Sequence, residues 1–520
     1  MLNKIFRILT LILTILVICW HPFSYSQDTT KSLAYKKKNL FIRYSMFYRP
    51  DLSYQLWHQF KLLQKAKKGD PIAEHELGLR YLMGEGFKAD TVLGAKWIGD
   101  AARKNLTSAE YNYAILLNNG WGVNWNPFKA YDYFQRAALD GMPQAEYILG
   151  VTHLNNLVIK KDLLTAYEWL KKSAEAGFLP AKEYLKKLEK RISPEKLKKI
   201  READKKSSTA KGKTFNNYIA GSTSTGLEII DFDLISDSIT KITDKNILSA
   251  LLSETNSNLA DSLGITDKND TTINLLKSGI SFLKKSANAG NPEALTLLGR
   301  MYAKGKYFKK DKIDAAVFYL RAARLNYPIA ANLLYQLIKN VKFISQIRKS
   351  AKKKNVKTMY IWYGLYTLGF LRDIAPKDAF NLILKAANKK YIPAMVELGL
   401  SYYTGNFTKK DKVKAKRIWD LAAKLGSNEA LTRLAATNIL EHKYKNINTD
   451  IELLNKASKL GSILAEVTLG SLYENGIGVK KNKSKAVMYY RASAQRGDRY
   501  AYNQLKRMYD EIRPKRFIIK

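Results

Sequence analysis

The sequence predicts an all-α fold, an α-solenoid built from helix pairs that repeat about every 36 residues. The clearest copy starts at Ala73, and shifts of 36 residues bring Ala109 and then Ala145 to the same place. Each copy has small or apolar residues at positions i, i+4 and i+5, which share one face of a helix. Each copy also ends at a glycine or asparagine, residue types that readily adopt the positive φ found after a helix. These end positions are Gly69, Asn105, Gly141 and Gly177.

A first block of repeats is predicted over residues 54–189. In each unit a first helix leads through a glycine-containing loop, such as Gly84-Glu85-Gly86, into a second helix. The second helix has an aromatic residue four positions before a pair of small residues, so the large and small side chains share one stripe. We expect these aromatic residues to belong to the core rather than to a ligand site. Tryptophans at or beside this position are Trp97, Trp169 and, in the second block, Trp419.

A second block is predicted over residues 271–510, where the repeat resumes. Between degenerate units near Ala330 and Thr358 the spacing falls to 28 residues and the glycine loop is lost, which predicts a kink or a changed superhelical pitch. A capping helix over 499–509 and a basic tail over 511–520 are expected to follow. Full units of this block begin at Ala294, Ala394, Ala430 and Ala465.

Residues 190–270 interrupt the repeats as a linker and an acidic insertion. Residues 207–226 are rich in Ser, Thr, Gly and Lys, a composition typical of a linker. Residues 214–270 carry nine acidic residues against three lysines, a net charge of −6 in a basic chain. Two interpretations remain: a loosely packed spacer, which is favoured, or a segment that folds back onto the basic repeats and competes with an acidic partner.

Residues 1–26 have the pattern of a secretory signal peptide, with Lys4 and Arg7 before an apolar run and small residues at its end. Cleavage is expected between Ser26 and Gln27, and an uncleaved membrane anchor is the alternative. The pattern predicts export to the periplasm or the cell surface, with no transmembrane helix after cleavage. Residues 27–53 form a basic and aromatic lead-in, which is expected to cap the open end of the solenoid rather than to bind a membrane or single-stranded nucleic acid.

The chain is strongly basic, with 88 Lys and Arg against 46 Asp and Glu and a formal net charge of +42. Removal of residues 1–26 would lower this charge to +40, because that segment contains two basic and no acidic residues. The excess reflects either lysines on solvated helix faces or an anionic partner such as an envelope glycan, lipopolysaccharide, an acidic lipid or an acidic protein. Nucleic acid is the least favoured partner, because the chain is expected to be exported.

The sequence predicts no catalytic residue, no cofactor and no metal site. Residues 74–76 read Glu-His-Glu, but adjacent residues on a helix point in different directions and do not form a ligand set. The Gly-x-Gly loops lack the strand that precedes a phosphate-binding loop. Cys19 is the only cysteine, so a mature chain would contain no thiol nucleophile and no disulfide. The histidines are scattered, at His21, His58, His75, His153 and His442.

The pattern Ala-x-x-x-Leu-Gly-x-x-Tyr-x-x-Gly-x-Gly, followed by Ala-x-x-Trp and Ala-Ala-x-x-Gly, resembles the Sel1-like repeat, a relative of the tetratricopeptide repeat. Residues 469–479, read as LGSLYENGIGV, are very close to it. The resemblance implies antiparallel helix pairs stacked in a right-handed superhelix whose concave face binds proteins. It also implies that exported bacterial members act as envelope adaptors or in contact with host cells. A cysteine-rich branch is linked to β-lactams, but its paired cysteines are absent here.

We therefore expect an exported, non-enzymatic scaffold or adaptor that binds a protein partner through its helical-repeat surface. The alternative is an envelope protein that binds a polyanion through its positive charge. The sequence does not identify the residues that would contact either partner.

Overall fold

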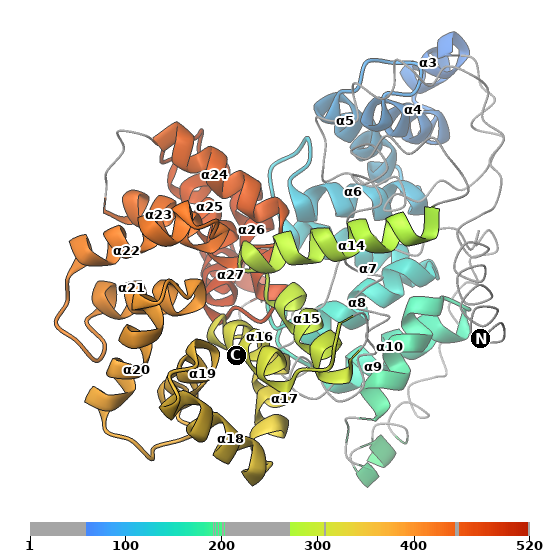
Figure 1. Cartoon of the computed structure of the whole chain (residues 1–520). Helices are drawn as coiled ribbons and strands as arrows, with labels where there is room; N and C mark the ends of the chain where they lie inside the picture. The colour runs from blue at the N-terminus through green and yellow to red at the C-terminus, as the bar shows by residue number, and fades with distance from the viewer. Residues whose placement is uncertain are drawn as a thin grey trace.

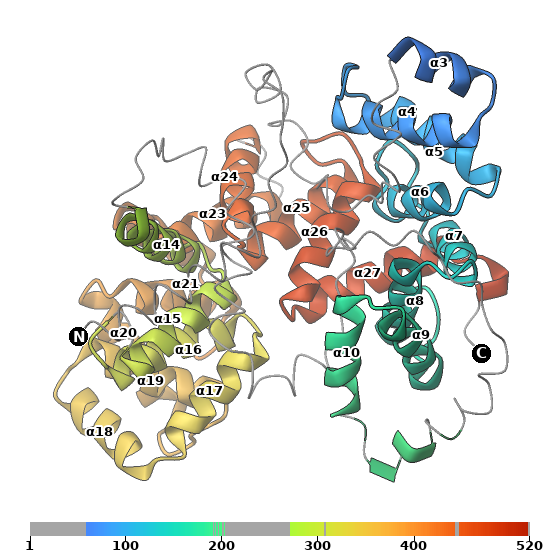
Figure 2. The same cartoon turned by 90° about the vertical axis from the view of Figure 1, so that its right-hand side faces the viewer.

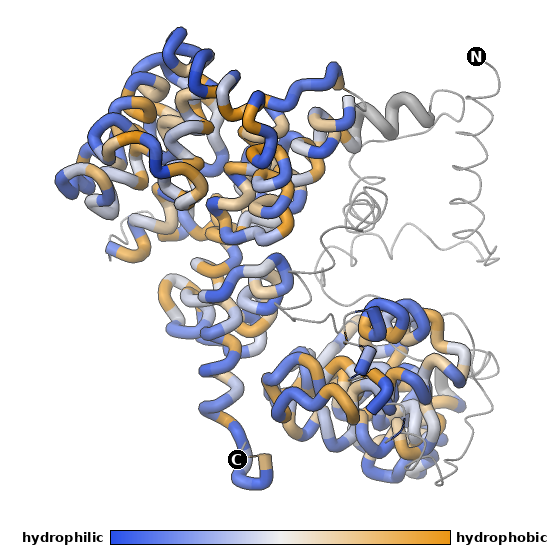
Figure 3. Tube along the Cα trace, turned by 90° about the horizontal axis from the view of Figure 1, so that it is seen from below, coloured by the Kyte–Doolittle hydropathy of each residue, from blue (hydrophilic) through white to orange (hydrophobic). Residues whose placement is uncertain are grey.

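The computed structural model describes residues 59–190, 271–305, 308–441 and 447–517, together with scattered positions between 192 and 202. All regular secondary structure in these ranges is helical (Figure 1). The predicted signal peptide 1–26, the lead-in 27–53, the acidic insertion 214–270 and the last three residues of the tail lie outside the described residues. Hydrophobic and hydrophilic stretches alternate along the described helices (Figure 3), and none of these helices is both long and apolar enough to span a bilayer.

The first block consists of antiparallel helix pairs in which each helix packs on the next one in the chain. The first and second helices of a unit are called helix A and helix B. Helices α4, α6, α8 and α10 occupy the helix A position, and α5, α7 and α9 the helix B position. Their bounds, with α3 before them, are α3 Gln59–Lys67, α4 Pro71–Met83, α5 Thr91–Arg103, α6 Thr107–Asn119, α7 Pro127–Leu139, α8 Pro143–Asn155, α9 Leu163–Glu175 and α10 Leu179–Glu189.

The second block runs from α15 to α26, in the same alternation except at α17 and α18, after a longer helix α14 and before the C-terminal helix α27. Its bounds are α14 Thr271–Asn288, α15 Pro292–Lys304, α16 Lys312–Arg324, α17 Pro328–Ile338, α18 Val341–Lys352, α19 Val356–Thr367, α20 Pro376–Asn388, α21 Ile392–Thr404, α22 Lys412–Lys424, α23 Asn428–Leu440, α24 Ile447–Lys459, α25 Ile463–Asn475, α26 Lys483–Gln495, α27 Arg499–Glu511 and the 3-10 turn η5 Lys515–Phe517.

The local sequence explains where these helices begin and end. Helix B usually starts after an Asp or Asn whose side chain accepts hydrogen bonds from the first backbone N–H groups, as Asp90 does from Val92. The turn that follows helix B has a positive φ at the predicted end positions Gly69, Asn105, Gly141 and Gly177, from 59° at Asn105 to 93° at Gly177. The exposed Lys390 also adopts a positive φ, of 58°, and its backbone N–H donates to the Ala387 carbonyl at 2.8 Å, so the turn forms even with a lysine where glycine or asparagine is usual. The predicted end positions are therefore confirmed.

Close helix packing within a unit requires a small residue on helix A. A Cβ on Gly399 would lie 2.3 Å from Nε1 of Trp419, which is buried on helix B and donates a hydrogen bond to the Val396 carbonyl at 3.0 Å. Trp419 is thus a core residue, as predicted. Trp97 and Trp169 are only half-buried. Both pack at the edge of the core, because the residue that follows each tryptophan, Ile98 or Leu170, faces the glycine of helix A instead.

The two blocks contact each other through the C-terminal end of the chain. Helices α26 and α27 lie between the blocks, beside α6 to α8 (Figure 2), and Tyr509 packs edge-on to Trp125 at 5.1 Å between ring centroids. Arg513, in the predicted tail, donates to the Leu157 and Val158 carbonyls, each at 2.6 Å. Helix α27 therefore packs on α26, and the end of the chain joins the second block to the first.

Candidate partner-binding site at the broken repeat

The regular alternation of the second block fails at α17 and α18, where the sequence predicts a kink. Helix α17 makes few contacts with α18, and α19 packs directly against α16. This packing is parallel, because residues near the start, middle and end of α16 meet the corresponding parts of α19. The contacts are an ion pair between Asp314 and Lys357, the apposition of Leu320 and Gly364, and a 2.7 Å hydrogen bond from Arg324 Nη1 to Thr367 Oγ1.

The glycine position of helix A changes in this stretch. The position five residues after the first small residue of helix A is Gly78, Gly150, Gly299, Gly399 or Gly470 in five regular units. The same position is Tyr335 in α17 and Tyr363 in α19. A side chain as large as that of Tyr335 hinders the close approach of a following helix, and α17 makes few contacts with α18, whereas α19 still pairs with α20. Residues 328–391 are called the broken unit below.

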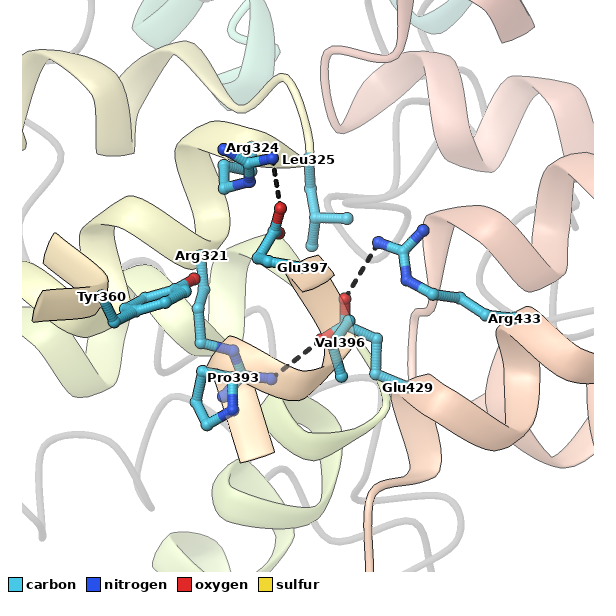
Figure 4. Close-up of a pocket in the computed structure, with 9 residues that line it drawn as sticks. All are labelled: Arg321, Arg324, Leu325, Tyr360, Pro393, Val396, Glu397, Glu429 and Arg433. Carbon is cyan, nitrogen blue, oxygen red and sulfur yellow. Dashed lines mark hydrogen bonds and ion pairs between the residues drawn. The ribbon is translucent and has the colours of Figure 1, made fainter. Parts of the chain in front are cut away.

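A network of charged side chains lies beneath this region and links α16, α21 and α23 (Figure 4). Glu429 accepts hydrogen bonds from Arg321 Nη2 at 3.0 Å and from Arg433 Nη2 at 3.1 Å, and Arg324 pairs with Glu397. Burial alone would raise the pKa of Glu429, but Arg433 and Arg321 hold it below its usual value. Glu429 therefore stays ionised near neutral pH, and the network acts as a structural link between the three helices, called the charged floor below.

An opening of about 450 Å³ lies between α16, α19 and α21. Tyr363 is buried in its wall and forms a 2.9 Å hydrogen bond with Ser401, whereas Leu368 and Phe407 are exposed at its rim. Arg324 lines both the opening and the charged floor. The lining residues are Ala323, Arg324, Asn326, Tyr363, Thr367, Leu368, Leu400, Ser401, Thr404, Asn406 and Phe407.

Phe407 has an unusual backbone conformation, with a φ of 65°. Glycines occupy the same loop position in regular units, with a φ of 72° at Gly86, 67° at Gly122 and 66° at Gly478. A bulky residue held at positive φ costs about 1–3 kcal/mol, and such strain often marks a functional site. The ring packs against Tyr363 and Tyr366, at 6.3 and 5.9 Å between centroids, and 41% of the residue remains exposed.

Further aromatic surface continues beyond the rim. Tyr335, at 45% exposure, stacks on Phe370 with 6.2 Å between centroids, and Phe370 follows Leu368 by two residues. The ammonium group of Lys339 lies 4.9 Å from the Tyr335 ring centroid. The opening itself is bordered by Leu368, which directly follows α19, and by Phe407 of the α21–α22 loop.

None of the residues that drew attention in the sequence lies at this opening. His75 is buried in α4 and contacts Asn112 through Nε2 at 2.7 Å. Glu74 pairs with Lys104 and Glu76 with Arg80, so the Glu-His-Glu run is divided among separate packing contacts. The described part of the chain contains no group of three or more His, Cys, Asp or Glu side chains that would hold a metal ion. The signal that sequence reasoning missed is the replacement of repeat glycines by Tyr335, Tyr363 and Phe407.

The chain is similar to known repeat proteins in the units on either side of the broken unit. The Sel1 repeat family matches residues 71–106, 107–142, 143–178, 292–327, 392–427 and 464–498. Residues 328–391 lie between two of these matches and belong to neither.

Two curated relatives share part of the chain. The chitin synthase regulator SKT5 of Saccharomyces cerevisiae is 24% identical over 304 residues, which make up 48% of this chain and 44% of SKT5. The ERAD-associated E3 ubiquitin-protein ligase component HRD3B of Arabidopsis thaliana is 33% identical over 108 residues, or 20% of this chain and 17% of HRD3B. The chain thus spans less than half the length of either relative.

A solved structure is similar over more of the chain. The crystal structure of c5321, a protective antigen present in uropathogenic Escherichia coli strains and displaying an SLR fold, is 21% identical. The similarity covers 89% of this chain and 92% of that chain, with a TM-score of 0.30. We therefore describe the relative placement of the helices from the contacts within this chain alone.

Proposed function

Because the chain belongs to the Sel1-like repeat family, we propose that it is a non-enzymatic adaptor that binds a protein partner through its helical repeats. The observation that carries this proposal is the opening at the broken unit, where Leu368 and Phe407 are exposed together instead of packing inside a repeat. Solenoid repeats present extended surfaces of this kind to partners. The names of SKT5, a regulator of a synthase, and HRD3B, a component of a ligase, are in keeping with such a role.

The test of adaptor function is retention of a partner that survives high salt. The chain from residue 27 onward, immobilised and exposed to an envelope extract, is expected to retain a specific protein from about 0.1 M to about 0.5 M salt, because apolar contacts are not screened. The Leu368→Ser variant should retain less of it. If the wild-type chain retains no protein at the higher salt concentration, the adaptor proposal is wrong.

We further propose that the adaptor acts outside the cytoplasm, in the periplasm or at the cell surface. Residues 1–26 support this location, because they combine a basic start, an apolar run and small residues before Gln27. Fractionation of the producing cells, followed by N-terminal sequencing, should find mature protein that begins at Gln27. Retention of residues 1–26 in the membrane fraction would instead favour the uncleaved anchor, and cytoplasmic protein would contradict export.

The second candidate function is binding of an envelope polyanion, and pairs of lysines in the loops before helix B favour it. These lysines are exposed, and none has an ion-pair partner in the described part of the chain. A polyanion held by them would dissociate steeply as salt rises, unlike the apolar contact proposed above. The pairs are Lys309-Lys310, Lys409-Lys410 and Lys480-Lys481.

A further inference from the structure

We infer that the opening at the broken unit binds one apolar side chain, preferably aromatic, from an extended peptide whose flanking residues are acidic. This inference rests on the proposed adaptor function and gives the chemistry of the partner. Other large apolar side chains that are strongly exposed, such as Val92, Leu139 and Leu440, lie on three separate helices. At the broken unit, by contrast, two exposed apolar side chains, Leu368 and Phe407, border one opening.

The dimensions of the opening fit a side chain rather than a whole folded surface. Its volume of about 450 Å³ falls within the range of small-ligand pockets, about 300–1,000 Å³. The wall is built from the Tyr363 and Leu400 side chains, and Phe407 and Leu368 stand at the rim. A phenylalanine or leucine side chain would be surrounded by these groups while the peptide backbone crossed the rim.

Arg324 is the one charged residue among those that line the opening. Its terminal nitrogens are held by Glu397 and Thr367, so the guanidinium is fixed in the wall. It therefore places positive charge beside the opening without itself projecting into it.

The charges around the rim favour acidic flanks. The carboxylates of this region are already paired, Glu397 with Arg324 and Asp373 with Arg348. Lys409 and Lys410 follow Phe407 in the same loop and are exposed without an ion-pair partner in the described residues. Carboxylates placed on either side of an apolar anchor would therefore meet unpaired ammonium groups.

The probe for this site is a short fluorescein-labelled peptide with acidic residues on both sides of one phenylalanine. Its binding to the full chain from residue 27 onward is measured by fluorescence anisotropy. Two matched peptides separate the two contributions: in one, serine replaces the phenylalanine, and in the other, amides replace every carboxylate. We expect each matched peptide to bind at least about tenfold more weakly than the parent peptide.

Three variants place the probe at the opening. Phe407→Gly removes the ring and restores the glycine that regular units carry, so the loop keeps its fold, and Leu368→Ser removes a second rim contact. Each should weaken the parent peptide about tenfold, whereas Leu139→Ser, a change at a more exposed leucine on α7, should leave binding unchanged. The double variant Lys409→Gln and Lys410→Gln should weaken the acidic peptide about threefold and flatten its salt dependence, without affecting the amide peptide.

The results separate this inference from the proposed function. If the serine peptide binds as tightly as the phenylalanine peptide, or if Phe407→Gly binds like the wild type, the inference is wrong. If the Phe407→Gly and Leu368→Ser variants still retain an envelope protein at about 0.5 M salt, the adaptor uses another surface and only the inference fails. If the wild-type chain binds the peptide but retains no envelope protein, the peptide site stands and the adaptor function fails.

Discussion

A regular unit and the broken unit have residues of different size at the same position of helix A, with different consequences for packing. In the unit over 392–427, Gly399 admits Trp419, and the large aromatic side chain is buried. In the broken unit, Tyr335 occupies the position of that glycine, and its ring stays on the surface. The comparison teaches that a small residue at this position lets the helices of a pair bury an aromatic side chain between them. A tyrosine at this position has to be accommodated elsewhere: Tyr335 stays at the surface, and Tyr363 is buried against Ser401 of α21.

The same contrast applies to charge. Glu429, beneath the broken unit, lies between two arginines that lower its pKa. Glu110, in the regular unit over 107–142, is buried with only a distant partner, because Arg136 Nη1 lies 3.7 Å away and its side chain is 56% exposed. Burial raises the pKa of Glu110 to about 7, although Arg136 acts to lower it. A buried glutamate is therefore stabilising in one place and costly in the other.

The largest effect is expected from Glu429→Ala. This change leaves Arg321 and Arg433 facing each other without the carboxylate between them and should lower the free energy of unfolding by about 3–5 kcal/mol. Since the pKa of Glu429 is lowered in the folded chain, its contribution is present at neutral pH and is lost as the pH falls through the folded pKa. Urea unfolding of variant and wild type at pH 7 measures the loss. A decrease in the free energy of unfolding of less than about 1 kcal/mol would mean that the ion pairs of Glu429 do not stabilise the contact between α16 and α23.

Glu110→Gln, in contrast, is expected to increase the free energy of unfolding. The pKa of Glu110 in the folded chain, about 7, exceeds its ordinary value of 4.5. The free energy of unfolding of the wild type therefore decreases as the pH rises from 4.5 to 7, and the full loss applies above pH 7. The variant should be more stable than the wild type by about 2 kcal/mol at pH 8 and nearly equal to it at pH 5. Thermal unfolding at both pH values tests this difference. If the variant is less stable at pH 8, the Arg136 contact outweighs the cost of burial.

The period and the helix ends were predictable because they depend on local chemistry. Positive φ at Asn105 and Gly141 follows from residue type and position alone. The burial of Trp419 was also predictable, whereas the half-buried positions of Trp97 and Trp169 were not, because the period does not specify which of two adjacent side chains faces the glycine.

The candidate site was only partly predictable. Loss of the glycine loop correctly indicated where the repeat pattern changes. The parallel packing of α16 on α19 was not predictable, because it depends on which helix packs against α16 where α17 and α18 do not pack as a regular pair. The contact of Arg513 with Leu157 joins residues 356 positions apart in the sequence, and no repeat pattern carries that information. The sequence does contain one signal for the site: Tyr335, Tyr363 and Phe407 each replace a glycine of the regular pattern.

The two glycine contacts should differ in their tolerance of one added methyl group. In Gly399→Ala the new Cβ meets the Trp419 indole, which is held by its hydrogen bond to the Val396 carbonyl, so the loss of stability should reach about 3 kcal/mol. In Gly364→Ala it meets Cδ2, Cδ1 and Cγ of the buried Leu320, a side chain that no hydrogen bond holds in place and that can shift more than the indole, so the loss should be smaller, about 2 kcal/mol. Thermal unfolding of the two variants ranks them. Equal losses would show that the broken unit is packed as tightly as a regular pair.

The smallest effect, a comparison of Phe407→Gly with Phe407→Ala, isolates the backbone strain at the opening. Both variants remove the same ring contacts with Tyr363 and Tyr366, but alanine must still adopt the φ of 65° that glycine adopts readily. The glycine variant should therefore be more stable than the alanine variant by about 1 kcal/mol. Urea unfolding of both variants in parallel measures the difference. Equal stabilities would mean that the loop relaxes without cost. In that case the backbone at residue 407 accepts any residue type without strain. The presence of phenylalanine would then not show that its ring is kept at the rim at a cost in backbone free energy.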